Sequence, residues 1–479
     1  MLASISLGVL LGFGCLLLLA SPWPFLAPLA VLGLMGWVVL YKRPAWGLLA
    51  LCTLVPFEGM FKDSGFSAAK LLGASLIVIM LFKLLLRQIP EIRLRSNLWG
   101  ALIAFLLCLL LSLVYSENLA VSFGYVRELA VGLVLFWVTL LIGREINLVM
   151  LCRLLSLSVA ATCVIALISA KHQVDGRAIG LLQDANYFAL LIAMALPPTM
   201  LLLLRASSRV EQLLWAGVVL LLLVGMTKTD SRSGLLVVLF TLGIGLWHYR
   251  HLLKKLRPKH LGFVMFAVAI LVPLAIATLP AEYVARIKSL SGITSGAHSA
   301  DTSLGRRTSY LLVGGEMIRQ NPLLGAGPGT FPIHYAHTGF ASGFSENLNE
   351  VDLFRRAHNT YLELLSEVGI PGGLSFLALV LIGLRNFERA RFSWLAKGQQ
   401  AEADLVTHLG LSLLAMAIFL LFLSAPNHKY LWVLLAISSI ARMRAAAPQP
   451  DNTRSQVPSP VFDQARGRYR MDRLGHGEG

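Results

Sequence analysis

Residues 358–372, HNTYLELLSEVGIPG, mark the point where a long hydrophilic segment gives way to an apolar helix. The polar pair His358-Asn359 opens the stretch, and the apolar run continues beyond Gly372 as LSFLALVLIGL. One continuous helix over 360–384 would be long enough to cross a membrane. We therefore expect His358 at the membrane–water boundary, at the mouth of a helix bundle for which the rest of the chain is the scaffold.

The composition of the 479-residue chain is that of a membrane protein, with 56% hydrophobic and 14% charged residues. Apolar runs of the roughly 17–25 residues that cross a hydrocarbon core recur along most of its length. These runs lack the alternating apolar and polar residues of barrel strands. The sequence therefore predicts an all-α polytopic membrane protein with about 12–14 transmembrane helices.

The candidate spans follow one another with short loops between them. The span at 44–57 is short and is interrupted by Pro56, and one re-entrant hairpin would reduce about fourteen spans to twelve. The apolar N-terminus lacks a basic segment and a cleavage site, so we expect a retained first helix. The spans lie near 4–20, 23–41, 44–57, 68–87, 98–115, 122–142, 148–170, 180–204, 212–228, 232–248, 261–279, 360–384, 405–424 and 428–443.

The net charge of +16 does not indicate a nucleic acid partner, because Lys and Arg concentrate in short loops between apolar runs. Such loops usually face the cytoplasm, and we place both termini there. The long hydrophilic segment then faces outward. The predicted division is a transmembrane bundle at 1–279, a periplasmic loop domain at 280–359, C-terminal transmembrane helices at 360–444 and a disordered cytoplasmic tail at 445–479.

The hydrophilic segment contains one predicted helix and one glycine-rich turn. Thr302 or Ser303 would cap a helix that runs to about Gln320, with Leu311, Gly315 and Ile318 on one face. The run LLGAGPGTF at 323–331 lacks the Lys-Ser/Thr ending of a P-loop, and no strand precedes it. A tight turn that packs the segment on the bundle is therefore favoured over a phosphate-binding loop.

Several arginines lie at the outward ends of spans, against the usual bias of positive charge toward the cytoplasm. A guanidinium near hydrocarbon is costly unless it faces a polar cavity or a partner, and its fork suits phosphate oxygens. Ion pairs with neighbouring acids, or an interfacial location, are the alternatives for each arginine. As a set they predict a diphosphate-binding site formed by Arg127, Arg177, Arg232, Arg306, Arg355 and Arg356.

His358 is the candidate general base, with Asn359 in a supporting role. A neutral imidazole at a membrane mouth can accept the proton of a sugar hydroxyl. His334 and His337 are rivals, and the three histidines together are too widely spaced to indicate a zinc site. The five cysteines lie within or close to apolar runs without metal-ligand spacing. We therefore expect no metal.

These residues resemble the superfamily of O-antigen ligases and polymerases. The signature of that superfamily is His followed by Asn, Ser or Gln, nine residues, Gly, two residues, and then Gly, Thr or Tyr. Here it is His358-Asn359, nine residues at 360–368, Gly369, two residues and Gly372. The segments NPLLGAGPGTF at 321–331, SRSG at 231–234 and DANYFA at 184–189 are also similar, so the resemblance spans about residues 175–375.

The resemblance implies a glycosyltransferase-C-like bundle with an external domain between two late helices. It implies glycosyl transfer from an undecaprenyl diphosphate carrier, without a metal, a nucleotide sugar or another cofactor. The catalytic role then falls on His358, and diphosphate binding falls on Arg232 and Arg306, with Arg177 next. The roles of Arg127, Arg355 and Arg356 are extrapolated from charge and position.

The expected activity is that of an O-antigen ligase, which joins the glycan to a lipid A–core sugar at the periplasmic face of a bacterial inner membrane. Its partners are the undecaprenyl diphosphate-linked O-antigen, the lipid A–core oligosaccharide and membrane lipids. An O-antigen polymerase and a protein O-oligosaccharyltransferase share the chemistry and remain alternatives. A flippase for the same lipid is the alternative of another class, although internal repeats typical of transporters are not evident.

Overall fold

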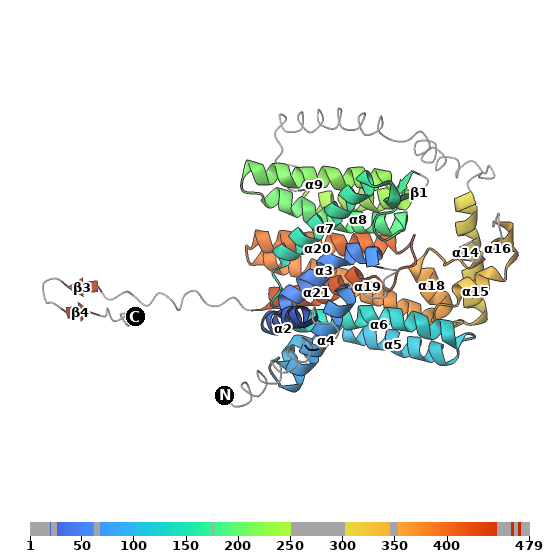
Figure 1. Cartoon of the computed structure of the whole chain (residues 1–479), viewed down its shortest axis with the longest axis horizontal. Coiled ribbons are helices and arrows are strands. Elements are labelled where there is room, and N and C mark those ends of the chain that lie inside the picture. Colours follow the sequence, from blue (N-terminus) through green and yellow to red (C-terminus); the bar gives the residue numbers. More distant parts are fainter. Residues whose placement is uncertain are drawn as a thin grey trace, which may run out of the picture.

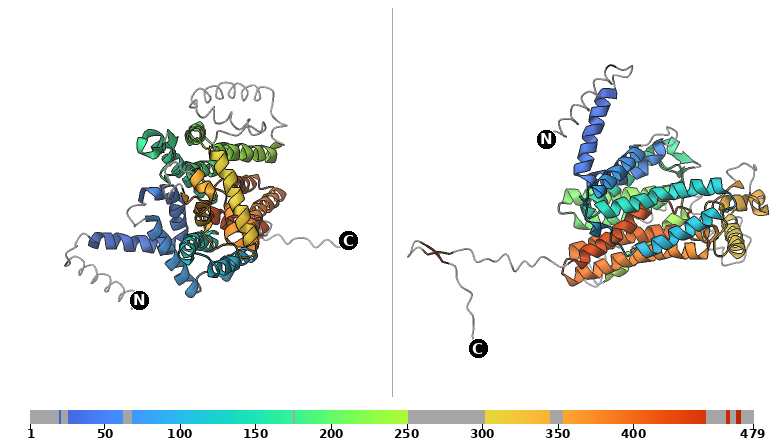
Figure 2. Two further views of the ribbon diagram at one scale, coloured as in Figure 1. Left: turned by 90° about the vertical axis from the view of Figure 1, so that its right-hand side faces the viewer. Right: turned by 90° about the horizontal axis from the view of Figure 1, so that it is seen from below.

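The computed structural model describes residues 20, 26–61, 68–174, 176–250, 302–344, 353–447, 461–463 and 468–470. Most of these residues form helices gathered in one bundle, in which most axes are roughly aligned and the helix at Leu26–Lys42 lies across the others (Figures 1 and 2). The bundle helices are α2 (Leu26–Lys42), α3 (Pro44–Leu54), α4 (Ala68–Leu85), α5 (Trp99–Val114), α6 (Leu119–Ile142), α7 (Leu148–Ile168), α8 (Ala185–Arg205), α9 (Arg209–Lys228), α10 (Arg232–His248), α19 (Gly369–Ala396), α20 (Gln400–Phe419) and α21 (Lys429–Ala446).

Apart from the 19-residue α14, the remaining elements are short. Along the chain, most of them connect one bundle helix to the next. At one end of the bundle, a group of helices stands beside the helix ends, whereas the chain leaves α21 at the opposite end (Figures 1 and 2). We call the end of the bundle that carries this group of helices the His358 end. The short elements are η1 (Val55–Phe61), η2 (Glu91–Leu94), η3 (Ala170–His172), β1 (Gln173–Val174), β2 (Arg177–Ala178), α14 (Thr302–Gln320), α15 (Phe331–Ala336), α16 (Gly339–Gly343), α18 (Thr360–Glu367), β3 (Val461–Asp463) and β4 (Arg468–Arg470).

The predicted class, an all-α polytopic membrane protein, is confirmed. Within the described residues, 7 helices are long and apolar enough to cross a membrane, or up to 8 when one bent pair counts as a span. The seven are α4, α6, α7, α8, α9, α19 and α20, while α5 and α10 are apolar but shorter. The predicted spans at 4–20 and 261–279 lie outside the described residues.

Two of the predicted spans differ in the structure. The runs at 23–41 and 44–57 form a pair, Ala30–Lys42 and Pro44–Met60, bent by 111°. Pro44 is the first residue of α3, and proline cannot continue a preceding helix because it lacks an N–H group and restricts the residue before it. The pair therefore counts as one candidate span rather than two.

The predicted continuous helix at 360–384 is wrong, because the chain breaks between α18 and α19. Gly369 adopts a φ of 81°, a left-handed conformation that favours glycine. A Cβ at this position would collide with the carbonyl of Leu323. The Ile370 N–H donates to the Pro322 carbonyl oxygen at 2.8 Å instead of continuing the helix. Contact with the segment after α14 thus separates a short α18 from the long α19.

Close packing around α21 forms the centre of the bundle. Trp432 is fully buried, and its indole N–H donates to the Pro426 carbonyl at 2.9 Å. Its ring meets Phe136 of α6 in an edge contact, with ring centroids 6.5 Å apart. Gly132 of α6 allows this approach, since a Cβ there would collide with the Trp432 ring.

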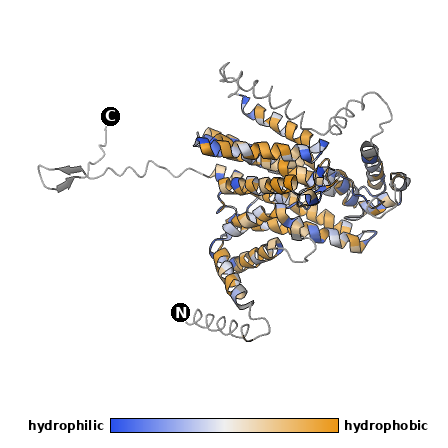
Figure 3. Ribbon diagram, turned by 45° about the horizontal axis from the view of Figure 1, so that its top comes forward, coloured by the Kyte–Doolittle hydropathy of each residue, from blue (hydrophilic) through white to orange (hydrophobic). Residues whose placement is uncertain are grey.

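The helices at the His358 end have a small core of their own, and they are less hydrophobic than the bundle (Figure 3). The predicted helix from Thr302 to Gln320 is confirmed as α14. Its predicted face is wrong, because Leu311 is 56% exposed whereas Tyr310, Val313 and Met317 are buried. The aromatic rings of Phe331 and Tyr335 in α15 pack on Tyr310 and select this other face.

Most of the predicted disordered tail at 445–479 lies outside the described residues. Within the described part, α21 extends to Ala446, and β3 pairs with β4 as an antiparallel ladder between Val461–Asp463 and Arg468–Arg470. At these six residues the structure therefore has a pair of short strands where the sequence predicted no order.

We expect Gly132→Ala to destabilise the bundle, because the added methyl group forces the buried Trp432 ring to move. Overpacking of this kind costs about 1–3 kcal/mol, which exceeds the roughly 1 kcal/mol that alanine gains over glycine in a helix. The measurement is the midpoint of thermal unfolding in detergent. Gly124→Ala on the same helix is the control, since a Cβ there meets nothing within 4 Å. An equal midpoint for both variants would contradict the packing argument.

Candidate active site

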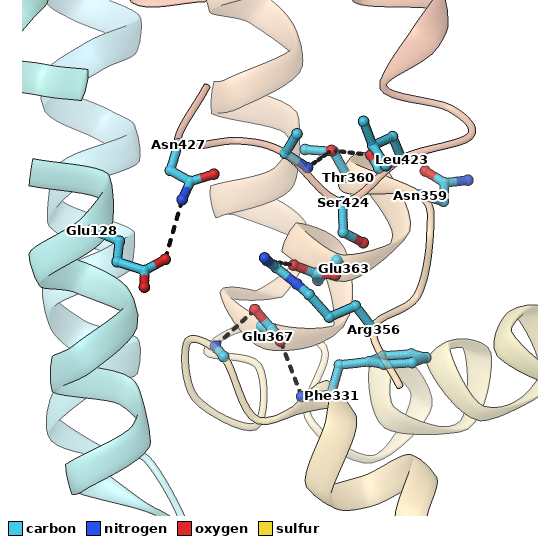
Figure 4. Close-up of polar contacts among 12 residues, drawn as sticks. Glu128, Phe331, Arg356, Asn359, Thr360, Glu363, Glu367, Leu423, Ser424 and Asn427 are labelled. Atoms are coloured by element: carbon cyan, nitrogen blue, oxygen red, sulfur yellow. Dashed lines mark hydrogen bonds and ion pairs between the residues drawn. The ribbon is translucent and has the colours of Figure 1, made fainter. Parts of the chain in front are cut away.

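His358 lies directly before α18, at a helix start that is tied to the segment between α20 and α21. The side chain of Asn359 accepts hydrogen bonds from the Tyr361 and Leu362 N–H groups, both at 3.1 Å, and so caps the helix. Thr360 is fully buried. Its N–H donates to the Leu420 carbonyl at 2.8 Å. Its hydroxyl donates to the Leu423 carbonyl at 2.6 Å (Figure 4).

The backbone of His358 adopts a left-handed conformation with a φ of 47°. Gln183 and Asp230 share this conformation, with φ values of 60° and 50°, and each also directly precedes a helix cap. Asp184 caps α8 and Ser231 caps α10. A left-handed residue therefore precedes the cap of three helices, and these helix starts include three of the four segments on which the sequence resemblance rests.

Hydrogen bonds join the starts of α8 and α10 to each other and to the loop at 420–428. The Ser231 hydroxyl donates to the Asn186 side-chain oxygen at 3.0 Å. The Tyr187 hydroxyl donates to the Ser424 carbonyl at 2.9 Å. Since Thr360 is bound to the same loop, all three helix N-termini meet at the His358 end. Each N-terminus carries a partial positive charge, which favours an anion.

The surroundings of His358 keep its imidazole neutral at neutral pH. Burial and the positive charge of Arg307 lower the pKa of His358 below its ordinary value, and Arg355 acts in the same direction. Asp184 and Glu363 oppose this shift. The Tyr310 ring covers the imidazole at a centroid distance of 5.8 Å and an angle of 31°. The site thus combines a neutral imidazole with the nearby positive charges of Arg307 and Arg355.

Behind His358, α18 carries two fully buried carboxylates one turn apart. Glu363 forms an ion pair with Arg356, whose guanidinium lies 5.6 Å from the centre of the Tyr125 ring (Figure 4). Glu367 accepts hydrogen bonds from the Gly329 N–H at 2.8 Å and the Phe331 N–H at 3.0 Å. Burial and the negative charge of Glu363 raise the pKa of Glu367, while the two N–H groups and Arg356 oppose the shift.

The glycine-rich turn packs the segment after α14 onto α18, as favoured from the sequence. Gly325, Gly327 and Gly329 have φ values of 70°, 114° and 77°, which require glycine. The Ala326 and Gly327 N–H groups donate to the Ser366 and Glu367 carbonyls at 3.1 Å and 3.0 Å. Because these N–H groups and that of Gly329 are bound by α18, they are not directed at a phosphate.

The six arginines predicted to bind a diphosphate lie at four different places. Arg355 and Arg356 lie beside His358, although Arg356 is engaged with Glu363. Arg232 is the first residue of α10, and Arg177 donates from Nε to the Thr229 carbonyl at 3.1 Å nearby. Arg306 donates to the Phe344 carbonyl.

Arg127 is the outlier of the six, because it lines a separate groove between α4 and α6. The neighbouring Glu128, which the sequence offered as an ion-pair partner for Arg127, accepts a hydrogen bond from the Asn427 side chain at 3.2 Å (Figure 4).

The rival histidines lie in other surroundings. The ring nitrogen Nε2 of His334 is 3.1 Å from a Glu117 carboxylate oxygen. His337 is exposed, and its ring nitrogen Nδ1 lies 2.8 Å from the Ile333 carbonyl oxygen. Within the described part of the chain, no group of three or more His, Cys, Asp or Glu side chains is arranged to hold a metal ion.

Sequence reasoning missed several residues of the site. Glu363 and Glu367 show a usable signal, because two acids four residues apart share one face of a helix, and this helix follows His358-Asn359. Arg307 was passed over for its neighbour Arg306, and nothing in the sequence separates the two. No sequence pattern marked Tyr310 as a residue of the site.

We expect Glu367→Ala to lower the stability of the protein, because it leaves the N–H groups of the half-buried Gly329 and the buried Phe331 without acceptors. Each unsatisfied group costs about 1–3 kcal/mol, so the expected loss is about 2–6 kcal/mol. The thermal midpoint in detergent measures it. Glu316→Ala is the control, since Glu316 is an exposed acid paired with Arg319 and its removal should leave the midpoint unchanged. Equal midpoints for the two variants would show that Glu367 does not hold the turn.

Comparison with known proteins adds one match. Residues 216–377 match the family model described as O-antigen ligase. No curated protein matches the chain. The matched region begins within α9 and ends within α19, so it includes the capped start of α10, all of α14 and the whole of α18 with His358 before it. This part of the chain is therefore similar to the O-antigen ligase family.

Proposed function

We propose that the protein is an inverting glycosyltransferase that moves O-antigen from undecaprenyl diphosphate to a sugar hydroxyl of lipid A–core. The observation that carries the proposal is the neutral, half-buried imidazole of His358, within the influence of the positive charges of Arg307 and Arg355 and at the place where the N-termini of α8, α10 and α18 meet. A proton acceptor beside fixed positive charge suits a reaction in which a hydroxyl attacks and a diphosphate leaves.

In the proposed reaction, His358 accepts the proton of the acceptor hydroxyl while that oxygen bonds to the anomeric carbon of the glycan. The bond from that carbon to the diphosphate oxygen breaks, and undecaprenyl diphosphate leaves with the bonding electrons. Direct displacement inverts the anomeric centre. Arg307 and Arg355 stabilise the growing charge on the leaving group, and the partial charges of the helix N-termini add to this effect.

The other arginines have supporting parts in this proposal. Arg232 and Arg177 lie at the N-terminus of α10 and would contact the far side of the diphosphate. Arg356 positions α18 through its ion pair with Glu363, and Arg306 positions α14 through the Phe344 carbonyl. Asn359 supports His358 by capping the helix that follows it.

The proposed location of the site is the periplasmic side of the bacterial inner membrane, with both termini in the cytoplasm. Basic side chains bind the ends of helices at the end of the bundle opposite His358. Arg444 donates to the Arg144 carbonyl at 2.7 Å, and Lys397 donates to the Ala445 carbonyl at 2.7 Å. Basic helix ends favour the cytoplasmic side, which leaves His358 on the other.

The direct test is transfer by purified protein in detergent, with undecaprenyl diphosphate-linked glycan and rough lipopolysaccharide, with a chelator and without ATP. We expect a ladder of glycan on lipopolysaccharide. His358→Ala should reduce the rate by about 100-fold or more, the contribution typical of a general base. His337→Ala is the matched control and should keep the rate, because His337 is exposed on α15.

Each other outcome identifies a different function. Lengthening of the carrier-linked glycan would indicate a polymerase, and transfer to Ser or Thr of a protein would indicate an oligosaccharyltransferase. A carrier lipid that crosses the bilayer without any joined product would indicate a flippase. Full activity of His358→Ala would contradict the assignment of the base.

The pH profile of transfer tests the environment of His358. Its pKa lies below the ordinary value near 6.5, so activity should persist below that pH and fall only when the imidazole is protonated. Arg307→Gln removes a positive charge that lowers the pKa of His358, so the acidic limb of kcat/KM should move to higher pH. A limb that does not move, or that moves to lower pH, would contradict the role given to Arg307.

A further inference from the structure

A groove separate from the His358 site lies between α4 and α6, with a volume of about 350 Å³. Most of its lining is apolar, and three cations lie among the lining residues: Lys70 of α4, Arg127 of α6 and Lys429 of α21. Lys70 and Lys429 stand in the first turns of their helices, and Arg127 stands in the third turn of α6. Lys70 is next to the first lining residue of α4, and Arg127 is the first lining residue of α6, so both cations lie at the N-terminal limit of the lining on their helices.

The apolar part of the groove runs from Arg127 toward the C-terminal end of α6. On α6 the lining continues to Val138, which is eleven residues beyond Arg127 and about 16 Å along the helix axis at 1.5 Å per residue. Ala74 and Val131 line the groove and are exposed. The groove is therefore open along its side, where the bilayer would surround α4 and α6.

Small residues on α4 leave space for a ligand in the groove. Gly73 lines the groove, and a Cβ built there meets nothing within 4 Å. The neighbouring Ala74 has only a methyl group. A flexible hydrocarbon chain would fill this space at low cost, because each methylene removed from water or a polar boundary contributes about 0.8 kcal/mol.

We propose that this groove captures the donor lipid from the bilayer, with its single polyprenyl chain between α4 and α6 and its diphosphate at Lys70, Arg127 and Lys429. The inference rests on the proposed function. Lys429 is already paired with Glu58, whereas Lys70 and Arg127 are exposed. Lys70 and Arg127 thus supply two positive charges besides Lys429. These two charges match the two negative charges of a diphosphate diester better than the single negative charge of a phospholipid phosphodiester.

Contacts of α6 and of the loop at 420–428 connect the Arg127 end of the groove to the His358 site. Arg127 is two residues from Tyr125, whose ring lies against the Arg356 guanidinium. Glu128 is bound by Asn427 of that loop, and the loop also holds Thr360 next to His358. Residues two apart on a helix point to different faces, so a diphosphate captured at Arg127 would reach the arginines beside His358 by passing around α6 from the groove face to the Tyr125 face. This position also explains why Arg127 is apart from the other arginines.

The test is binding of undecaprenyl diphosphate to the full chain in phosphatidylcholine nanodiscs, together with the donor KM in the transfer assay. Gly73→Trp fills the groove without meeting a protein atom at Cβ, and Val131→Trp fills it from α6. Both variants should raise Kd and the donor KM by about tenfold or more, which corresponds to about 1.4 kcal/mol. Arg127→Gln should raise both constants in the same way.

Gly217→Trp on α9 is the matched control, because Gly217 is exposed and a Cβ there also meets nothing within 4 Å. If Gly73→Trp and Val131→Trp keep the wild-type Kd and KM, the groove is not the binding site for the donor lipid. The proposed function would still stand in that case, provided that the parent protein catalyses transfer. Loss of binding in these variants with no transfer by the parent would keep the groove and refute the proposed function. Displacement of the probe by an equal amount of phosphatidylglycerol would overturn its identity as a polyprenyl diphosphate site.

Discussion

The hydrogen bonds of Thr360 fix the position of α18, and the site at the His358 end depends on them. The Thr360 hydroxyl donates to the Leu423 carbonyl and accepts from the Ala425 N–H at 2.9 Å, so the helix start and the loop at 420–428 move as one. One turn and two turns later, Glu363 and Glu367 bind Arg356 and the glycine-rich turn. An eight-residue helix is thereby tied to α14, α15 and the bundle at once.

This arrangement explains why buried charge is tolerated next to an apolar bundle. Burying a carboxylate is costly unless it is paired or hydrogen-bonded. Glu363 has a guanidinium, and Glu367 has two backbone N–H groups from a turn whose left-handed glycines aim them inward. The same contacts hold His358 in its left-handed conformation beside Arg307 and Arg355, where a neutral imidazole is favoured.

Patterns local in sequence predicted the fold class and several elements well. The length of the apolar runs predicted the membrane helices, and the capping residues at Thr302 and Ser303 predicted the start of α14 to within about one residue. The break at Gly369 was missed, because the apolar run continues through it and only contact with Leu323 requires the left-handed turn. Likewise, the contacts of His358 with Tyr310 and of Glu367 with Gly329 join residues that are far apart in the chain. Single-sequence patterns do not encode such pairs.

The measurement that tests the account most directly is a cryo-electron microscopy map of the protein with undecaprenyl diphosphate-linked glycan bound. The account predicts density for the diphosphate beside Arg307 and Arg355, with the first sugar facing the His358 imidazole. Diphosphate density at the opposite end of the bundle, near Arg144 and Arg444, with the His358 surroundings empty, would contradict it.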